Sequence, residues 1–182
     1  MKTLNNYILE RLNPKNLGFK DTLPKKLKEK YKLIYNPGTG RYDCDDDIAV
    51  EDDLIKRGEF ICNFGVVRGY FSCYDCKNLE SLKGAPREVG RFFCCIGCNK
   101  LKSLEGAPEK VDGYFDCSEC DNLESLKGAP KEVGGDFDCT VCKKLTSLEG
   151  APEKVGKSFY CYDCPKLKDY NINTKVGGEL IK

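Results

Sequence analysis

The stretch FDCSECDNLESLKGAPKEVGGD, residues 115–136, decides the fold, because the chain repeats it with small changes before and after. The next 22 residues, 137–158, read FDCTVCKKLTSLEGAPEKVGKS. The unit is F-x-C-x-x-C-x-x-L-x-x-L-x-G-A-P-x-x-V, and its phenylalanine recurs every 22 residues, at Phe71, Phe93, Phe115, Phe137 and Phe159. Self-similarity at a fixed period of this size is typical of solenoids, in which each coil packs against its neighbours.

The spacing within the unit predicts which side chains point inward. The phenylalanine and the first cysteine are two residues apart, so both face one side of a short strand. The second cysteine and the two leucines follow at intervals of three, which suits a turning chain that keeps sending side chains into a core. Gly-Ala-Pro interrupts regular structure and predicts an extended return path.

The periodicity also predicts how the chain is divided. Residues 67–170 hold five 22-residue coils, and residues 171–182 form a C-terminal partial coil. Residues 1–66 do not repeat clearly, and we predict that they form a cap of two helices, a hairpin and a degenerate half-coil. The helices are expected at residues 4–12 and 22–32, before a hairpin whose turn is Asn-Pro-Gly-Thr-Gly. The predicted fold class is therefore α/β, a solenoid of mostly parallel strands with extended convex returns and an N-terminal α/β cap.

The segment F-x-C-x-x-C-x-x-L resembles L-x-L-x-x-[N/C]-x-x-L, the strand and turn of leucine-rich repeats. The following L-x-x-L-x-G-A-P-x-x-V is similar to the short, proline-bearing convex side of bacterial and phage repeats of that family. Phenylalanine and cysteine stand where the family usually has leucine. The resemblance implies a curved solenoid with a concave strand face and a role in protein binding. Similarity to phage-encoded repeats further implies a phage protein that inhibits a host factor by binding it.

Ten of the 13 cysteines belong to the repeat, and their spacing allows two interpretations. Cys73-x2-Cys76-x18-Cys95-x2-Cys98 fits a four-cysteine zinc pattern, which predicts a zinc- or thiol-based protein. The alternative is that the thiols are small core groups that donate weakly to backbone carbonyls. We favour this alternative, without metal, cofactor or disulfides, because five pairs do not divide into four-ligand sites. Cys94, outside the repeated pair, is the one thiol expected to face the concave surface, and we therefore expect it to be the most reactive.

Composition excludes several classes of function. There are 30 Lys and Arg against 29 Asp and Glu, so no net field attracts nucleic acid or a membrane. The chain has no histidine, which excludes histidine-based triads and imidazole metal ligands. No apolar run suits a membrane span or a signal peptide, which favours a cytoplasmic protein with reduced thiols. We expect a protein that is not an enzyme.

If phenylalanine and the first cysteine point inward, their neighbours form the concave face, with four positions in each coil. None of these twenty positions is Lys or Arg, whereas several are aromatic or acidic. We predict a partner protein that is basic at its contact surface, and we expect nucleic acid to avoid this face. The residues predicted to bind the partner are Tyr70, Tyr74, Asp75, Phe92, Tyr114, Asp116, Glu119, Asp136, Asp138, Tyr160, Tyr162 and Asp163.

Charge is segregated near the N-terminus, where residues 1–41 carry a net +7 and residues 43–53 a net −7. The two segments are expected to neutralise each other, although a basic arm that binds nucleic acid is an alternative. The aspartates of the second segment could also gather calcium, but the run lacks the glycine and distal glutamate of an EF-hand. At the other end, residues 176–181 predict a last partial strand whose open edge could support a homodimer.

Overall fold

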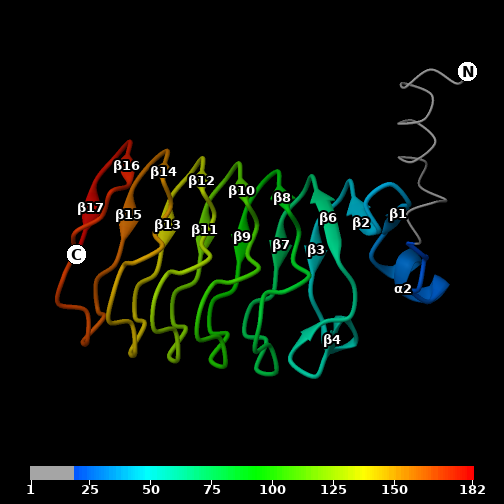
Figure 1. Ribbon diagram of the computed structural model, residues 1–182, viewed down its shortest axis with the longest axis horizontal. Coiled ribbons are helices and arrows are strands. Elements are labelled where there is room, and N and C mark those ends of the chain that lie inside the picture. Colours follow the sequence, from blue (N-terminus) through cyan, green and yellow to red (C-terminus); the bar gives the residue numbers. More distant parts are fainter. Residues whose placement is uncertain (1–18) are drawn as a thin grey trace, which may run out of the picture.

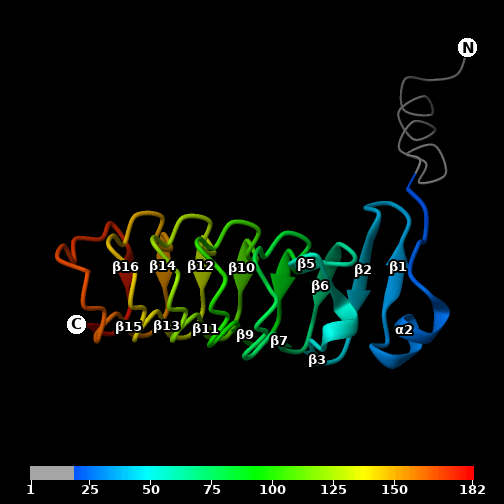
Figure 2. The same cartoon turned by 90° about the horizontal axis from the view of Figure 1, so that it is seen from below.

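The structure is a computed structural model that describes residues 19–182, and these residues form a mostly parallel β-solenoid of about six turns (Figures 1 and 2). The coils lie side by side in a nearly straight row, so the strand face expected to be concave is flat. Helix within residues 19–182 is confined to α2 (Lys25–Lys30) and a 3-10 turn, η2 (Asp52–Leu54). The regular structure of this part of the chain is therefore almost all strand, and the helical component of the predicted α/β class is nearly absent from it.

Two long sheets and one short hairpin hold the coils together. The first, which we call sheet A, has the strand order β1 (Ile34–Asn36), β2 (Arg41–Cys44), β6 (Phe64–Val67), β8 (Glu88–Val89), β10 (Lys110–Val111), β12 (Glu132–Val133), β14 (Lys154–Val155) and β16 (Lys175–Val176). The second, sheet B, has the order β17 (Leu180–Ile181), β15 (Phe159–Tyr160), β13 (Phe137–Asp138), β11 (Phe115–Asp116), β9 (Phe93–Cys94), β7 (Phe71–Ser72) and β3 (Ile48–Ala49). The hairpin joins β4 (Ile55–Lys56) to β5 (Glu59–Phe60).

Register follows the sequence period without slippage through the central coils. Phe115 pairs with Phe93 on one side and Phe137 on the other, and Val111 pairs with Val89 and Val133. Each repeated side chain therefore lies beside its own copies, and the rows run along the solenoid axis. This arrangement confirms that one 22-residue unit is one coil.

The return path is extended, as the sequence predicts, but its strands also pair with one another and form a second parallel sheet, which was not predicted. Proline lacks an N–H, so the ladder resumes just after it: Arg87 N donates to Gly65 O at 2.8 Å and Gly90 N to Val67 O at 2.8 Å. The tight turn before the proline requires glycine. A Cβ on Gly106, which has φ +92°, would lie 2.6 Å from the backbone nitrogen of Lys83.

The predicted inward set is confirmed. All five repeat phenylalanines are fully buried. The first leucine of each unit, three residues after its second cysteine, is buried as well. Adjacent phenylalanine rings lie 4.9–5.6 Å apart from Phe71 to Phe159. A single coil could not exclude water from these side chains, whereas the stack covers both faces of each inner ring.

The N-terminal segment extends sheet A. The predicted hairpin is present: β1 and β2 are antiparallel, with Tyr35 opposite Tyr42, and β2 pairs with β6. The second predicted helix appears as α2, shorter than residues 22–32, while the helix expected at residues 4–12 lies outside the described residues. Leu23, Tyr31 and Leu33, which flank α2, are buried in the core. Coil-like pairing already begins at β2 and β3, whose partners are β6 and β7.

The last strand predicted at residues 176–181 is present as two strands, one in each sheet. Val176 pairs with Val155 and Leu180 with Phe159. Both side chains are only partly buried, in contrast to the repeat positions that they continue. Among the described residues β16 and β17 are edge strands, and dimerisation through them stays a prediction.

Candidate functional site

The outer face of sheet B and of the turn that follows it carries four rows of side chains, which we call the sheet B face. The first row, just before the strands, is Tyr70, Phe92, Tyr114, Asp136 and Ser158. The second, on the strands, is Ser72, Cys94, Asp116, Asp138 and Tyr160. The third is Tyr74, Ile96, Ser118, Thr140 and Tyr162, and the fourth is Asp75, Gly97, Glu119, Val141 and Asp163.

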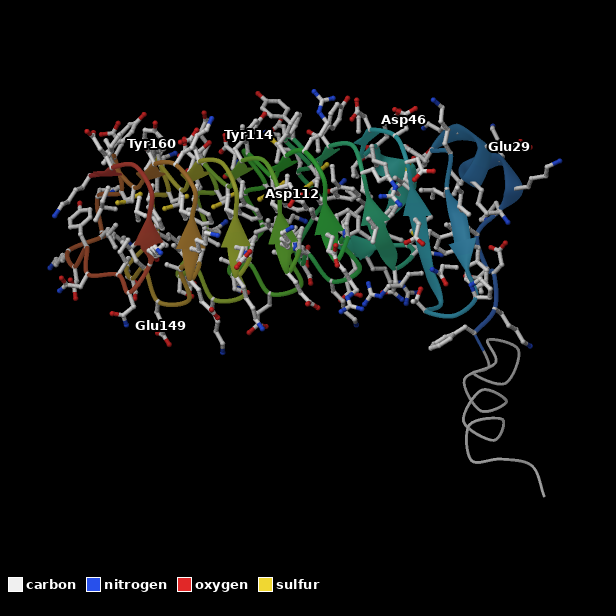
Figure 3. All side chains as sticks on the ribbon, turned by 90° about the horizontal axis from the view of Figure 1, so that it is seen from above. Glu29, Asp46, Asp112, Tyr114, Glu149 and Tyr160 are labelled. Atoms are coloured by element: carbon white, nitrogen blue, oxygen red, sulfur yellow. The ribbon has the colours of Figure 1, made fainter. Side chains whose placement is uncertain are left out.

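The structure brings all twelve predicted partner-binding residues onto this one face. The inward burial of Phe71 and Cys73 and their equivalents confirms the strand phase from which these residues were chosen. Figure 3 shows Tyr114 and Tyr160 projecting from the same side of the solenoid, opposite Glu149.

The first row begins as a ladder of stacked rings. The ring centroids of Tyr70 and Phe92 are 4.7 Å apart with an interplanar angle of 13°, and those of Phe92 and Tyr114 are 4.7 Å apart with an angle of 5°. Tyr114 is 41% exposed. Because strand register fixes the spacing, the rings form a preordered surface that loses little entropy on contact with a partner.

The carboxylates of the middle coils are anchored through one oxygen each. Asp116 Oδ1 accepts bonds from Ser118 N at 3.0 Å and Ser118 Oγ at 2.7 Å. Asp138 Oδ1 accepts from Thr140 N at 2.8 Å, and Asp136 Oδ1 from Ser158 N at 2.9 Å. Within residues 19–182, none of these three aspartates forms an ion pair. Burial raises the pKa of Asp116, and the nearby charge of Asp138 raises it further.

Some members of the face are covered. Ser118 and Thr140 are buried at 9% and 4% exposure, so the third row offers solvent mainly Tyr74 and Tyr162, at 66% and 41%. Cys94 is only 6% exposed, and burial raises its pKa. Cys94 lies on the sheet B face, as expected, but its burial disfavours the expected reactivity, because the flanking coils cover a short side chain that lies on the sheet.

The fourth row lies in a left-handed turn that ends each strand. Asp75, Glu119, Val141 and Asp163 have φ values between +53° and +58°, and Gly97 has φ +68°. Aspartate and glycine tolerate this conformation, whereas a β-branched valine is strained in it. The turn makes the chain leave the sheet and aims the second cysteine of the unit inward.

The repeat cysteines bond the coils to one another. Eight of the ten repeat thiols donate to a backbone carbonyl of an adjacent coil: Cys117 Sγ reaches Asp138 O at 3.3 Å, and Cys120 Sγ reaches Cys95 O at 3.1 Å. Equivalent bonds recur along both rows, from Cys73, Cys98, Cys139, Cys142, Cys161 and Cys164. All 13 cysteines are buried and free of disulfide bonds.

These thiols have the opposite of a reactive environment. Burial raises the pKa of Cys62 to about 12 and holds that of Cys117 and Cys139 well above the usual value. A metal ligand or nucleophile requires the thiolate, which this environment disfavours. Within residues 19–182 no three Cys, Asp or Glu side chains come together where they could hold a metal ion.

The outer rows of sheet A carry a different pattern, which the sequence analysis missed. Glu88, Lys110, Glu132 and Lys154 are adjacent in register, so the charge alternates at every coil. The row beside it alternates too, as Arg87, Glu109, Lys131 and Glu153, with Arg87 Nη2 at 3.2 Å from Glu109 Oε1. The signal is visible in the sequence as a two-coil period, KGAP[RK]EV followed by EGAPEKV.

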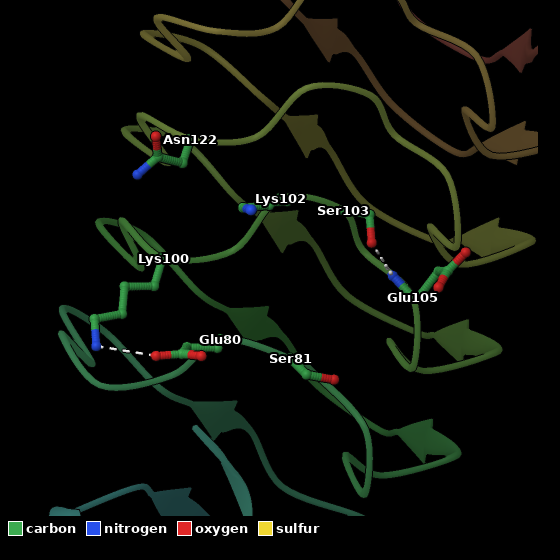
Figure 4. A pocket seen from close by; sticks show the side chains of 7 residues that line it. All are labelled: Glu80, Ser81, Lys100, Lys102, Ser103, Glu105 and Asn122. Carbon is green, nitrogen blue, oxygen red and sulfur yellow. Dashed lines mark hydrogen bonds and ion pairs between the residues drawn. The ribbon is translucent and has the colours of Figure 1, made fainter. Parts of the chain in front are cut away.

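Most of the surface depressions lie away from the sheet B face, although one beside the N-terminal segment includes Tyr70 in its lining. Another, of about 600 Å³, lies over the strandless third side of the coils and is shown in Figure 4. Its polar lining includes Lys100, whose Nζ is 3.0 Å from Glu80 Oε1 of the preceding coil, and Ser103, whose Oγ accepts from Glu105 N at 3.4 Å. These groups satisfy one another and form no nucleophile–base pair.

The charged N-terminal segments do pair, as expected, where the structure describes them. Lys30 Nζ lies 2.9 Å from Glu51 and 2.7 Å from Asp53, and Lys32 pairs with Asp46. Asp43 accepts from Val66 N at 2.8 Å, and Asp47 accepts from Tyr70 N at 2.9 Å. The aspartates considered as a calcium site are thus divided among Lys32, Arg68 and backbone amides.

Comparison with protein-family models, curated proteins and solved structures found no match. Among the described residues, no helix is long and apolar enough to cross a bilayer.

Proposed function

We propose that this protein is a non-enzymatic protein-binding module that uses the sheet B face. The observation that carries the proposal is the contrast in charge between the faces. Lysine and arginine occur at every second coil of the outer rows of sheet A, yet at none of the twenty positions of the sheet B face. A face that only had to remain hydrated could carry the same alternating pairs.

Exposed rings support the same function. Tyr74, Tyr114 and Tyr162 are among the most exposed large apolar side chains of the described residues, and all three lie on this face. Tyrosines on rigid scaffolds are frequent anchors of protein interfaces, because they bury much area and lose little side-chain entropy. The surrounding carboxylates select a partner that is basic where it makes contact.

The origin of the module belongs to the same proposal. The motif F-x-C-x-x-C-x-x-L relates the coils to short leucine-rich repeats of bacterial and phage proteins, although here the returns form a second sheet. Such a relationship favours a phage protein that binds a host factor and blocks it, inside the cytoplasm, without a cofactor.

The experiment is affinity capture with a matched pair of variants. The face variant carries Tyr74→Ala, Tyr114→Ala and Tyr160→Ala. The control carries Glu88→Ala, Lys110→Ala and Glu132→Ala on the outer face of sheet A. We expect the face variant to lose a captured protein that wild type and control retain. We also expect the affinity of the wild type for that captured protein to fall as the salt concentration rises. Thermal melting of each protein checks that the coils are intact.

Retention of every captured protein by the face variant would contradict the proposal. So would binding that is insensitive to ionic strength and to all three tyrosines.

A further inference from the structure

The aromatic ladder of the sheet B face stops in the middle of its row. Tyr70, Phe92 and Tyr114 stack at a constant 4.7 Å, but the next two positions of the row are Asp136 and Ser158. Strand pairing of Phe115 with Phe137 fixes Asp136 as the neighbour of Tyr114. Neither short side chain can stack on the tyrosine, so one face of a 41%-exposed ring has no aromatic partner among the described residues. The row therefore contains a site shaped for one more planar group.

Hydrogen-bond acceptors surround this site on the next coil. Asp136 lies within it, and Asp138 and Asp116 lie on the adjacent row. In each carboxylate the described residues engage only Oδ1, so Oδ2 is available to a donor from outside. The three carboxylates do not converge on a metal site. They require an occupant that is larger than an ion, planar and rich in donors.

The opposite end of the ladder is completed within the chain. Asp47 occupies the position before Tyr70, because Ile48 pairs with Phe71, and Tyr70 N donates to its Oδ1 at 2.9 Å. Arg91 brings a guanidinium to this end, with Nη1 3.6 Å from Asp47 Oδ1. The Asp136 end has the same aspartate at the end of the ladder, but no Lys or Arg of the described residues pairs with it.

Resting on the proposed protein-binding function, we propose that this end of the ladder is an arginine slot, in which a guanidinium from the partner protein stacks on Tyr114 and donates to Asp136 and Asp138. A guanidinium is planar, carries five N–H donors and stacks on aromatic rings, whereas an ammonium does none of these as well. The arginine is the anchor of the interface, and Tyr74, Tyr160 and Tyr162 surround it with further contact area.

The test titrates the full, ¹⁵N-labelled chain with the capped peptide acetyl-Gly-Arg-Gly-amide and follows backbone amide shifts. The expected shifts concentrate at residues 113–116 and 135–140. The matched lysine peptide is expected to bind about fivefold more weakly, which is the size of one exposed cation–π contact. Shifts that spread evenly over the acidic surface, equal binding of both peptides, or no localised shift up to the solubility limit would overturn the slot.

Two variants test the geometry from opposite directions. Tyr114→Ala removes the stacking surface, and Asp136→Tyr fills the slot by extending the ladder; each should weaken the arginine peptide at least fivefold. Glu132→Gln removes a carboxylate from sheet A and should change nothing. Asp136→Tyr loses the hydrogen bond from Ser158 N, so its melting temperature is compared with that of the wild type. If Asp136→Tyr does not fold, Tyr114→Ala provides the test alone, because the side chain that it removes is exposed. Unchanged peptide affinity in Tyr114→Ala would refute the slot.

The slot and the proposed function fail in different ways. If the captured partner is lost by the triple tyrosine variant but retained by Asp136→Tyr, protein binding stands and the slot falls. If the partner is retained by both variants, the proposed function itself falls.

Discussion

On sheet A, glutamate and lysine alternate along the outer rows, whereas on sheet B Asp116, Asp136 and Asp138 form no ion pair with any Lys or Arg of residues 19–182. Both faces are built from the same coils at the same spacing, so backbone geometry does not explain the difference. In-register stacking places each side chain beside its own copies, where like charges repel. From Glu88 to Lys154, sheet A avoids this repulsion by a two-coil period, although Lys154 then lies beside Lys175, whereas sheet B retains it between Asp116 and Asp138. The repulsion retained on sheet B is what the proposed binding role of that face would explain.

The inner linings differ as well, and alkaline pH should reveal the largest effect. The side chains that face the core from sheet B are phenylalanines followed by buried cysteines, whereas those that face the core from sheet A are valines. Burial raises the folded-state pKa of Cys76 to about 12, and that of Cys117 and Cys139 well above the ordinary value of 9.0. Stability from these protonated thiols is therefore complete below pH 9.0 and is lost as pH rises toward the folded-state pKa.

Each thiol that ionises only on unfolding lowers the free energy of unfolding by about 1.4 kcal/mol per pH unit above that point. Several thiols together predict a steep fall of the melting temperature between about pH 9 and pH 11, measured by circular dichroism under reducing conditions. Cys117→Ala should reduce by one the number of protons released on unfolding, and so make the pH dependence of the free energy of unfolding less steep. A flat profile would show that the interior does not exclude thiolates.

A large-to-small substitution compares the two inner rows directly. Phe115→Ala removes the central ring of the buried phenylalanine row and should destabilise the fold by about 3–5 kcal/mol. Val111→Ala, on the sheet A side of the same coil, should cost about 2 kcal/mol, because fewer methyl groups are lost. Urea denaturation measures both. Equal costs would mean that the phenylalanine row is not the principal packing element.

Reversing one charge on sheet A should break its alternation. Lys110→Glu places three glutamates in succession, at residues 88, 110 and 132, and should destabilise the fold by about 0.5–1 kcal/mol at low salt. Lys110→Gln is the control for loss of the lysine alone. The difference between the two variants should shrink as salt screens the exposed charges; a difference that salt does not alter would point to packing instead.

Removing one charge on sheet B should have the opposite sign. Asp138→Asn keeps an oxygen that accepts from Thr140 N but removes the repulsion between neighbours, so stability should rise by a few tenths of a kcal/mol. The same variant should bind the arginine peptide more weakly. A variant that loses stability, or gains it without loss of binding, would contradict the view that sheet B sacrifices stability for recognition.

The sequence predicted the coil well because its signals are local and repeated. The 22-residue period fixed the register, and the two-residue spacing of Phe115 and Cys117 fixed which side of the strand is buried. The twelve residues that the sequence analysis selected as candidates for partner binding share one face for that reason. The structural role of the thiols was also predicted, since five pairs cannot be distributed among four-ligand sites.

What could not be predicted depends on neighbours in space. The strand after Pro86 was missed because two-residue strands carry no periodicity of their own and exist only through their copies in adjacent coils. Cys94 was expected to react, but its accessibility depends on the side chains of the flanking coils. The alternation of Glu88, Lys110 and Glu132 was readable, yet its energetic meaning appears only when these residues are known to be adjacent.

By itself, the sequence determined that this protein is a stack of 22-residue coils with phenylalanine, cysteine and leucine inside, because a repeated pattern must bury the same side chains in every coil. Only the tertiary structure decided that the stack is straight and that the returns form a second sheet. It also decided that three rings align beside three carboxylates that use only Oδ1 in hydrogen bonds with the described residues. Those features depend on distances between residues 22 positions apart, which the chain acquires only when its coils are in register.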